Sequence, residues 1–283
     1  MPGVPTISAA LAAQQAIGRI EARVLLREVL NQSDAWLLAH GDDALTAAQS
    51  QQYAALVARR INGEPVAYIT GRREFHGREF TVTPAVLIPR PETELLVELA
   101  LQRLPAAAPC RVLDLGAGSG CIGVTLAAER PQAQVTLVDA SASALAIARA
   151  NAAQWAPANT AALRSDWYAA IGDERYDLIV ANPPYVADGD AHLAQGDLRF
   201  EPPSALAAGP DCLDDIRRII AGAREHLLPG GWLLFEHGHD QASACAALLR
   251  DAGFAALVAE RDLAGIVRVG GGRRTDPVPD QPG

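Results

Sequence analysis

The chain has 283 residues, of which 49% are hydrophobic and 20% charged, so it carries enough apolar material for a folded core and is not a disordered or fibrous chain. Its net charge of −9 comes entirely from residues 81–283, and an acidic body without a basic stripe argues against nucleic acid as the main ligand. All 24 basic residues are arginines, which excludes Schiff-base chemistry and a phosphate-binding lysine.

The cysteines and the N-terminus indicate the compartment. Cys110, Cys121, Cys212 and Cys245 stand far apart without a Cys-x-x-Cys pair, as expected of reduced cysteines in the cytosol. The first eighteen residues lack the positive region that begins a signal peptide, and no later stretch offers about 18 uninterrupted apolar residues. We therefore expect a cytoplasmic protein that does not bind membranes.

The N-terminal part is predicted to form a separate, smaller domain, because a chain of 283 residues is long enough for one large and one small domain. In residues 1–62 apolar side chains recur at helical spacing, and Thr46 with Gln49 forms a capping box that opens a helix to about Asn62. This pattern predicts a small helical bundle. Residues 63–90 are interpreted as a hairpin linker, with short strands expected at 68–70, 79–82 and 86–88.

Residues 91–272 alternate between helices and strands. Helices are expected at 92–103, from about 121, from about 143, at 214–228 and at 241–252. Strands are expected at 111–115, 134–139, 177–181, 232–236, 254–260 and 266–269. This rhythm is typical of an α/β fold with a doubly wound sheet. The tail 273–283, rich in proline, aspartate and glycine, is expected to be disordered.

A glycine-rich turn follows the first of these strands. In Gly116-Ala117-Gly118-Ser119-Gly120, glycine lets the backbone turn tightly, and the N-terminus of the following helix favours an anionic group. Asp139 ends the next strand, 21 residues beyond Gly118, where a ribose-binding acid belongs. Turn and acid together predict a nucleoside cofactor, in preference to a turn that serves only packing.

The turn alone does not distinguish two cofactors, because Gly118-x-Gly120-x-x-Gly123 also satisfies the NAD fingerprint. Asp114, two residues before the first glycine, resembles the acid of the Asp/Glu-x-Gly-x-Gly-x-Gly motif in class I methyltransferases, which implies S-adenosyl-L-methionine. Later, Ser165-Asp166-Trp167 offers a carboxylate for an adenine amino group and a ring to lie against it. A surface acid beside a core tryptophan explains that pair equally well.

The strand expected at 177–181 stops at Asn182-Pro183-Pro184-Tyr185, because two prolines cannot donate to a sheet ladder. The Asn182 side-chain oxygen and the Pro183 carbonyl then lie at the carboxyl edge of the sheet, where open α/β folds bind ligands. Two such acceptors can hold both protons of a planar –NH2 group and favour positive charge on its attacking nitrogen. Tyr185 would stack on that group. A turn that merely ends the strand is the alternative.

This tetrapeptide resembles the (Asn/Asp)-Pro-Pro-(Tyr/Phe) signature of methyltransferases that modify planar amino groups: adenine N6, cytosine N4 and the glutamine side-chain amide. Four further segments narrow the choice, namely residues 63–71, 87–94, 165–167 and 199–206. With them, the chain resembles the bacterial peptide-chain release factor N5-glutamine methyltransferases, the HemK/PrmC family, over roughly residues 15–270.

The resemblance implies the class I methyltransferase (Rossmann-like) fold. It also implies methyl transfer from S-adenosyl-L-methionine to N5 of the glutamine in the Gly-Gly-Gln motif of class I release factors. It assigns cofactor binding to the glycine turn, Asp139, Asp166, Trp167 and Asn182. It assigns catalysis to Asn182, Pro183 and Tyr185, and substrate binding to these three with Pro184. The helical bundle would dock the release factor, and we expect a monomer.

Two other functions fit parts of the sequence. A DNA or RNA adenine N6 methyltransferase shares the tetrapeptide, but the acidic body and the lack of a basic recognition domain count against it. A non-catalytic module with a nucleoside pocket is the second, and the intact tetrapeptide argues against it. His237-x-His239-Asp240 offers potential metal ligands, but methyl transfer needs no metal, so none is expected.

Overall fold

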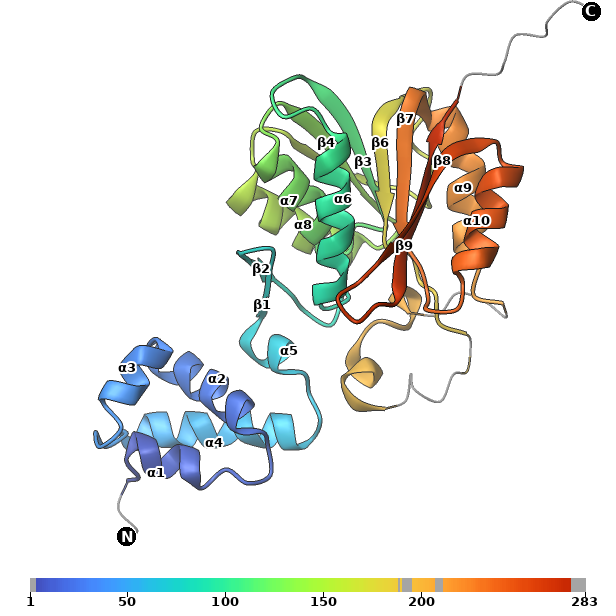
Figure 1. Ribbon diagram of the computed structural model, residues 1–283. Coiled ribbons are helices and arrows are strands. Elements are labelled where there is room, and N and C mark those ends of the chain that lie inside the picture. The colour runs from blue at the N-terminus through green and yellow to red at the C-terminus, as the bar shows by residue number, and fades with distance from the viewer. Residues whose placement is uncertain (1–3, 188, 190–194, 207–210, 276–283) are drawn as a thin grey trace, which may run out of the picture. The chain divides into compact units, whose positions relative to one another are not determined.

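The computed structural model of the protein describes residues 4–187, 189, 195–206 and 211–275. The chain forms two compact units: one comprises Met1–Arg72 with Ala194–Phe200, and the other comprises Arg73–Leu193 with Glu201–Gly283 (Figure 1). Each unit has a hydrophobic core of its own. The chain first leaves the smaller unit at Arg72, inside the segment 63–90 that the sequence suggests as a linker.

The smaller unit is a bundle of helices, as predicted. Its helices are α1 (Ile7–Ala12), α2 (Arg19–Leu30), α3 (Asp34–Ala39), α4 (Ala47–Ile61) and α5 (Val66–Thr70). The expected capping box is present: the N–H of Gln49 donates to Thr46 Oγ1 at 3.2 Å, and the N–H of Thr46 donates to Gln49 Oε1 at 2.8 Å. Apolar residues from all five helices, Leu25 and Val57 among them, form one buried cluster.

Residues 68–70 belong to α5, so the strand expected there is wrong. The carbonyl of Pro65 accepts hydrogen bonds from the N–H groups of Tyr68 and Ile69, both at 3.0 Å, and Gly71 ends the helix with a φ of +74°. Ile69 is buried in the bundle core. The proline and glycine boundaries, with this packing, override the strand preference of the aromatic and β-branched side chains.

A short hairpin begins at Arg72. Its strands are β1 (Arg72–Phe75) and β2 (Arg78–Thr81), and both turn residues, His76 and Gly77, have positive φ, of 50° and 73°. Such angles are typical of the tight turns that join two antiparallel strands. The strand expected at 79–82 is thus present as β2, which begins and ends one residue earlier than predicted. The expected strand at 86–88 is wrong, because these residues lie outside any strand.

The larger unit is built on a seven-stranded sheet in the order β5-β4-β3-β6-β7-β9-β8. The five strands from β3 to β7 pair in parallel, and β9 runs antiparallel to β7 and β8. The strands are β3 (Cys110–Leu115), β4 (Ala133–Asp139), β5 (Thr160–Arg164), β6 (Tyr176–Ala181), β7 (Leu227–Glu236), β8 (Phe254–Arg261) and β9 (Val267–Arg274). The predicted doubly wound α/β fold is confirmed.

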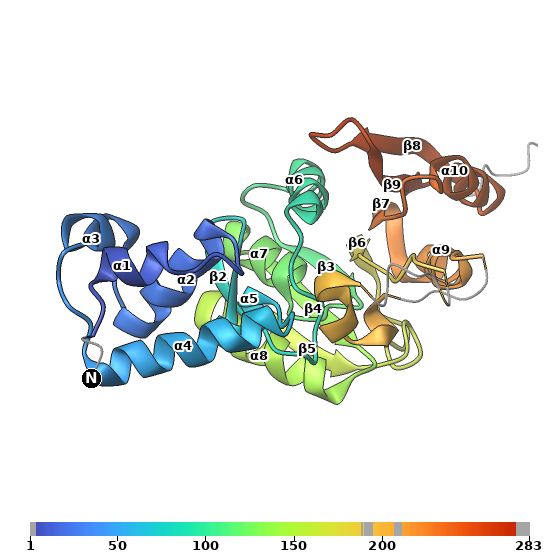
Figure 2. The same cartoon turned by 90° about the horizontal axis from the view of Figure 1, so that it is seen from below.

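Helices cover both faces of this sheet, α6 to α8 on one face and α9 and α10 on the other (Figure 2). They are α6 (Glu94–Arg103), α7 (Cys121–Glu129), α8 (Ala142–Trp155), α9 (Asp214–His226) and α10 (Ala242–Asp251). Neighbouring residues of β3 pack into different cores: Val112 lies in the core on the α6 to α8 side, and Leu113 lies in the core on the α9 side. The central strands are therefore buried on both faces, as in other parallel sheets.

The parallel strands bring polar residues to one edge of the sheet. Asp139 and Glu236 are the last residues of β4 and β7, and Asn182 follows β6 directly. Because the carboxyl ends of parallel strands meet at the same edge, these three side chains are placed where doubly wound folds bind ligands.

The last strand is longer than predicted. Arg273 and Arg274 belong to β9, so the disorder expected from residue 273 is wrong at these two positions. Arg273 lies opposite Trp232, and its Nε donates to the carbonyl of Gly230 at 3.0 Å. Thr275 is exposed and follows the strand, and residues 276–283 of the expected tail lie outside the described residues. Within the described part of the chain, we find no helix that is both long and apolar enough to cross a membrane.

Candidate active site

A cavity of about 270 Å³ opens at the carboxyl ends of the parallel strands in the larger unit. The structure brings most of the predicted site residues to its wall. These are Gly116, Ala117, Gly118, Ser119, Asp139, Asp166, Trp167, Asn182 and Pro184. Gly120, Pro183 and Tyr185 are predicted site residues that do not line it.

The loop between β3 and α7 forms one wall of the cavity. Gly116, Gly118 and Gly120 have φ angles of +70°, +54° and +79°, a conformation that side chains disfavour. Gly120 also lacks room for a side chain, since a Cβ there would lie 3.1 Å from Val124 and 3.3 Å from Ala148. The three glycines therefore turn the chain sharply from the strand into the helix, and the N-terminus of α7 is placed beside the cavity.

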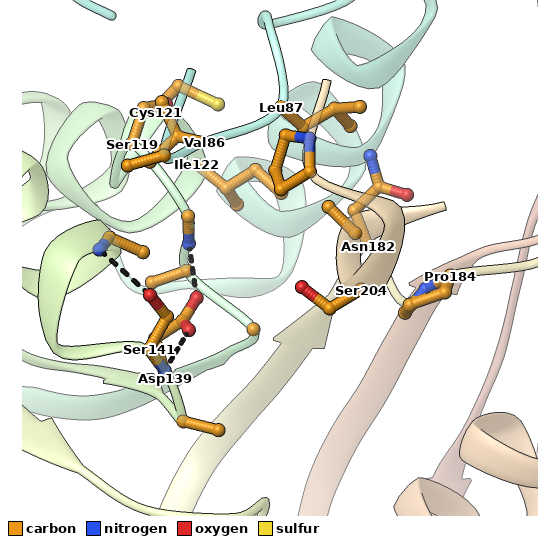
Figure 3. Close-up of a pocket in the computed structure, with 18 of the residues that line it drawn as sticks. Val86, Leu87, Ser119, Cys121, Ile122, Asp139, Ser141, Asn182, Pro184 and Ser204 are labelled. Atoms are coloured by element: carbon orange, nitrogen blue, oxygen red, sulfur yellow. Dashed lines mark hydrogen bonds between the residues drawn. The ribbon is translucent and has the colours of Figure 1, made fainter. Parts of the chain in front are cut away.

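Asp139 is bound to this loop (Figure 3). Its Oδ2 accepts a hydrogen bond from the N–H of Gly118 at 2.9 Å, and its Oδ1 accepts one from the N–H of Ser141 at 2.8 Å. Each carboxylate oxygen has two lone pairs, so Asp139 keeps acceptor capacity for a ligand. The glycine turn and the acid, which the sequence singled out separately, form one connected structure.

Asp114 stands below the loop and is not among the cavity residues. It is completely buried, and its Oδ2 accepts a hydrogen bond from the N–H of Gly123 at 2.9 Å. Burial raises the pKa of Asp114 to about 7, although the Gly123 hydrogen bond lowers it. A side chain at Gly123 would collide with Leu137, 2.3 Å away. The last glycine of the apparent NAD fingerprint therefore allows α7 to pack closely on the sheet.

The Ser165-Asp166-Trp167 turn follows β5 and is fixed by α9. Trp167 has a φ of +48°, and its Nε1–H donates to Asp215 at 3.1 Å. The exposed carboxylate of Asp166 forms an ion pair with Arg218 at 2.7 Å. Asp215 and Arg218 also line the cavity. Sequence reasoning missed both, since nothing in the pattern of an amphipathic helix marks its first two turns as part of a site.

Asn182 lies across the cavity from Asp139. Figure 3 shows Asp139 with Ser141 on one side of the pocket and Asn182 with Pro184 on the other. Asn182 Nδ2 donates to Thr93 Oγ1 at 3.2 Å, and its Oδ1 accepts no hydrogen bond from the residues that the structure describes. The acceptor end of the amide is therefore available to a ligand.

Thr93 and Glu236 extend this contact, and sequence reasoning missed both. Thr93 is the last residue of a 3₁₀ helix, Pro91–Thr93, and its Oγ1 donates to Glu236 Oε2 at 2.7 Å. The hydroxyl of Tyr185 donates to Glu236 Oε1 at 3.0 Å. Burial raises the pKa of Glu236 and that of Tyr185. Glu236 ends a parallel strand just as Asp139 does, and that position was the signal that could have revealed it.

The groups around the cavity fit S-adenosylmethionine. A helix N-terminus in a glycine loop suits the carboxylate of the amino acid part, the Asp139 carboxylate suits ribose hydroxyls, and the Trp167 ring suits a flat base. The acceptor of Asn182 stands on the same cavity. Nucleoside-binding groups beside a hydrogen-bond acceptor for a second molecule are what a group transfer between the two requires.

Fold and site together define a class I, S-adenosylmethionine-dependent methyltransferase. Residues 92–199 match the family described as methyltransferase small domain, and residues 6–71 match the PrmC N-terminal domain family. The chain is 54% identical over 263 residues to the release factor glutamine methyltransferase of Bordetella pertussis, covering 93% of this chain and 97% of the relative. The Escherichia coli enzyme of the same name is 45% identical over 255 residues, or 90% and 92%. The chain belongs to the release factor glutamine methyltransferase family.

A solved structure supports the fold alone. A methyltransferase from Pyrococcus furiosus matches with a TM-score of 0.54 at 15% sequence identity, over 79% of this chain and 100% of that chain.

Proposed function

We propose that this protein transfers the methyl group of S-adenosylmethionine to the side-chain amide nitrogen, N5, of the glutamine in the Gly-Gly-Gln motif of class I peptide-chain release factors. The observation that carries the proposal is the Asn182 amide, whose acceptor end is available on the cavity that the glycine loop and Asp139 also line. The family to which the chain belongs supports the same substrate.

Each side of the cavity takes one reactant in this proposal. The segment Gly116-Ala117-Gly118-Ser119-Gly120 holds the cofactor carboxylate, Asp139 holds its ribose, and Asp166 with Trp167 holds its adenine. S-adenosylmethionine supplies an electrophilic methyl group on a positively charged sulfur. The Asn182 Oδ1 on the cavity wall accepts one proton of the glutamine amide, and we assign the other proton to the carbonyl of Pro183, which lies outside that wall. Pro184 and Tyr185 complete the substrate side.

Catalysis then rests on positioning and electrostatics. An amide nitrogen is a weak nucleophile because its lone pair is delocalised into the carbonyl group. Two acceptors on its N–H bonds orient that lone pair toward the methyl carbon and stabilise the positive charge that develops on nitrogen. As the new N–C bond forms, the electrons of the old bond remain on sulfur, and the methylated amide then loses one proton to water. No covalent enzyme intermediate is needed.

In this proposal the helical bundle binds the release factor. We assign the helical bundle, which the structure extends to Arg72, to docking of the intact release factor, and residues 91–272 to methyl transfer, in a monomer that works in the cytoplasm. Two large apolar side chains of the bundle, Ile20 and Leu38, are 80% and 73% exposed, and the docking role requires that such side chains become buried against the release factor.

The experiment is a methylation assay with a defined product. The protein is incubated with S-adenosylmethionine and a purified class I release factor, and peptide mass spectrometry then locates any added methyl group. We expect one methyl group, on the Gly-Gly-Gln glutamine, and none on a release factor with alanine at that position. Adenine-containing DNA and RNA serve as competing substrates. Methylation of either, with an unmodified release factor, would contradict the proposal.

A further inference from the structure

The number of available protons determines which group donates in the hydrogen bonds that link Asn182, Thr93 and Glu236. A carboxylate has no proton to donate, so Glu236 accepts from both Thr93 and Tyr185. The Thr93 hydroxyl has a single proton, and the 2.7 Å bond to Glu236 uses it. The Thr93 oxygen can then only accept from Asn182. The amide must therefore turn its –NH2 group toward Thr93.

The orientation of this amide decides what the cavity presents to a substrate. With Nδ2 bound to Thr93, Asn182 offers the acceptor Oδ1. In the opposite orientation it would offer a donor, which repels the –NH2 group of a glutamine. An asparagine amide has nearly the same shape in both orientations, so only its hydrogen-bond partners can select one.

We propose that Glu236, acting through Thr93, is the positioning residue that selects the acceptor orientation of Asn182 and so makes the site specific for an amide nitrogen. The inference rests on the proposed function, in which Asn182 holds the substrate amide. Tyr185 contributes by donating to the second oxygen of the carboxylate, so both oxygens of this buried group are engaged. Glu236 is the last residue of β7, is 2% exposed and does not line the cavity, so it acts on the substrate only through its partners.

The charged groups around Glu236 decide when it is ionised. Burial and the negative charge of Glu92 raise its pKa, whereas Arg268 on β9 and the two hydroxyl donors lower it. Cys121 on α7 is a further titratable group within its electrostatic reach. When pH falls through this raised pKa, Glu236 gains a proton and can donate to Thr93. The Thr93 proton is then released to bind Oδ1 of Asn182, and the selected orientation is lost.

The first test uses threonine variants in single-turnover methylation of the release factor. Thr93→Val removes the relay hydroxyl and should lower the rate constant by roughly 10-fold or more, a smaller loss than that of a direct polar contact to the transition state, because Asn182 itself remains. Thr93→Ser keeps the hydroxyl and should restore it to within about threefold. The matched control is Thr125→Val, because Thr125 on α7 is equally buried and its Oγ1 has no hydrogen-bond partner among the described residues. We expect that control to be as fast as the wild type.

The second test follows the pH profile of Glu236→Gln. A neutral glutamine can either accept a hydrogen bond from Thr93 or donate one to it, so the rate of this variant should lie between those of the wild type and Thr93→Val. The fall in rate at low pH that protonation of Glu236 causes should also be absent from the variant. Asp114, with a pKa of about 7, is also protonated as the pH falls. The effect of Glu236 is therefore measured as the difference between the pH profiles of the wild type and Glu236→Gln. An identical fall in rate at low pH in both proteins would overturn the inference.

The outcomes separate this inference from the proposed function. If the wild type leaves the release factor glutamine unmodified, the proposed function fails. If it methylates the glutamine and Thr93→Val is equally fast, or Thr93→Ser is as slow as Thr93→Val, only the positioning role fails. A purely structural role would lower the melting temperature and cofactor affinity of Thr93→Val along with its rate, and this outcome would also overturn the inference.

Discussion

The guanidinium of Arg90 lies 2.7 Å from the carboxylate of Glu201, whose side chain is completely buried. Arg90 precedes the 3₁₀ helix that carries Thr93, and it lines the cavity. The ion pair therefore joins the segment before the sheet to the chain beyond β6, across 111 residues of sequence. Removing Arg90 takes away the positive charge that lies 2.7 Å from this buried carboxylate, and breaking a buried pair is destabilising.

We expect Arg90→Ala to lower the free energy of unfolding by about 3 kcal/mol, the lower range for breaking a buried pair. Arg90→Leu combined with Glu201→Leu should recover most of this loss, because no charge is then left buried. The control is Arg27→Ala, whose pair with Asp34 is 41% and 48% exposed and should contribute less than about 1 kcal/mol. Urea unfolding measures all four proteins. Equal losses for Arg90→Ala and Arg27→Ala would contradict the importance of burial.

A second prediction concerns the exposed apolar residues of the bundle. Replacing Ile20 and Leu38 with glutamate should raise KM for the intact release factor by roughly 10-fold or more, because exposed apolar side chains of a docking surface carry much of its binding energy. The value of kcat and the stability should change little, since both side chains already face water. Leu263→Glu, at a still more exposed site in the larger unit, is the control. Unchanged kcat/KM in the double variant would remove the docking role.

A third prediction concerns Asp139→Ala. Loss of a charge-assisted hydrogen bond to the ribose should weaken S-adenosylmethionine binding by about 1.5 to 3 kcal/mol, or roughly 10- to 150-fold in Kd. The variant also removes the acceptor of the Gly118 and Ser141 N–H groups, so the glycine loop loses its anchor. Asp139→Asn, which keeps an acceptor, should lose less. Isothermal calorimetry gives both constants, and a Kd equal to that of the wild type would refute the assignment.

Local signals predicted those parts of the structure that a few neighbouring residues determine. The capping box of Thr46, the alternation of strands and helices, and the glycine turn each depend on residues close in sequence. The strand expected at 68–70 is wrong because Pro65 and Gly71, six positions apart, bound a helix there, and because Ile69 packs into the bundle. Arg273 was assigned to the tail because its partner, Gly230, is 43 residues away.

The same reasoning explains what was found and missed in the site. Asp139 and Asn182 stood at strand ends beside recognisable motifs, so the sequence pointed to both. Thr93 lies in the segment 87–94 that carries the family resemblance, but nothing in that segment assigns it a role, and its two hydrogen-bond partners, Asn182 and Glu236, are 89 and 143 residues away. Only the parallel sheet, which brings the ends of β6 and β7 together, joins them into one hydrogen-bonded group. Contacts of this kind depend on the tertiary fold and leave no local pattern.

The most direct prediction concerns Asn182→Ala. Methyl transfer should fall by roughly 100-fold or more, the usual effect of losing one preorganised polar contact to a transition state. The loss should appear mainly in kcat, because the side-chain oxygen holds the amide proton most strongly while positive charge develops on nitrogen. The fold and most of the cofactor affinity should remain, since the side chain is hydrogen-bonded only to Thr93 among the described residues.

Asn182→Asp is the informative companion to that variant. A carboxylate also accepts hydrogen bonds, so partial activity should survive, but it cannot donate to the Thr93 oxygen as the asparagine amide does. Its rate should therefore lie between those of the wild type and Asn182→Ala. Single-turnover measurements with the release factor rank the three proteins. If Asn182→Ala methylated the release factor at the wild-type rate, the tetrapeptide would only end a strand, and the catalytic role proposed for it would have to be given up.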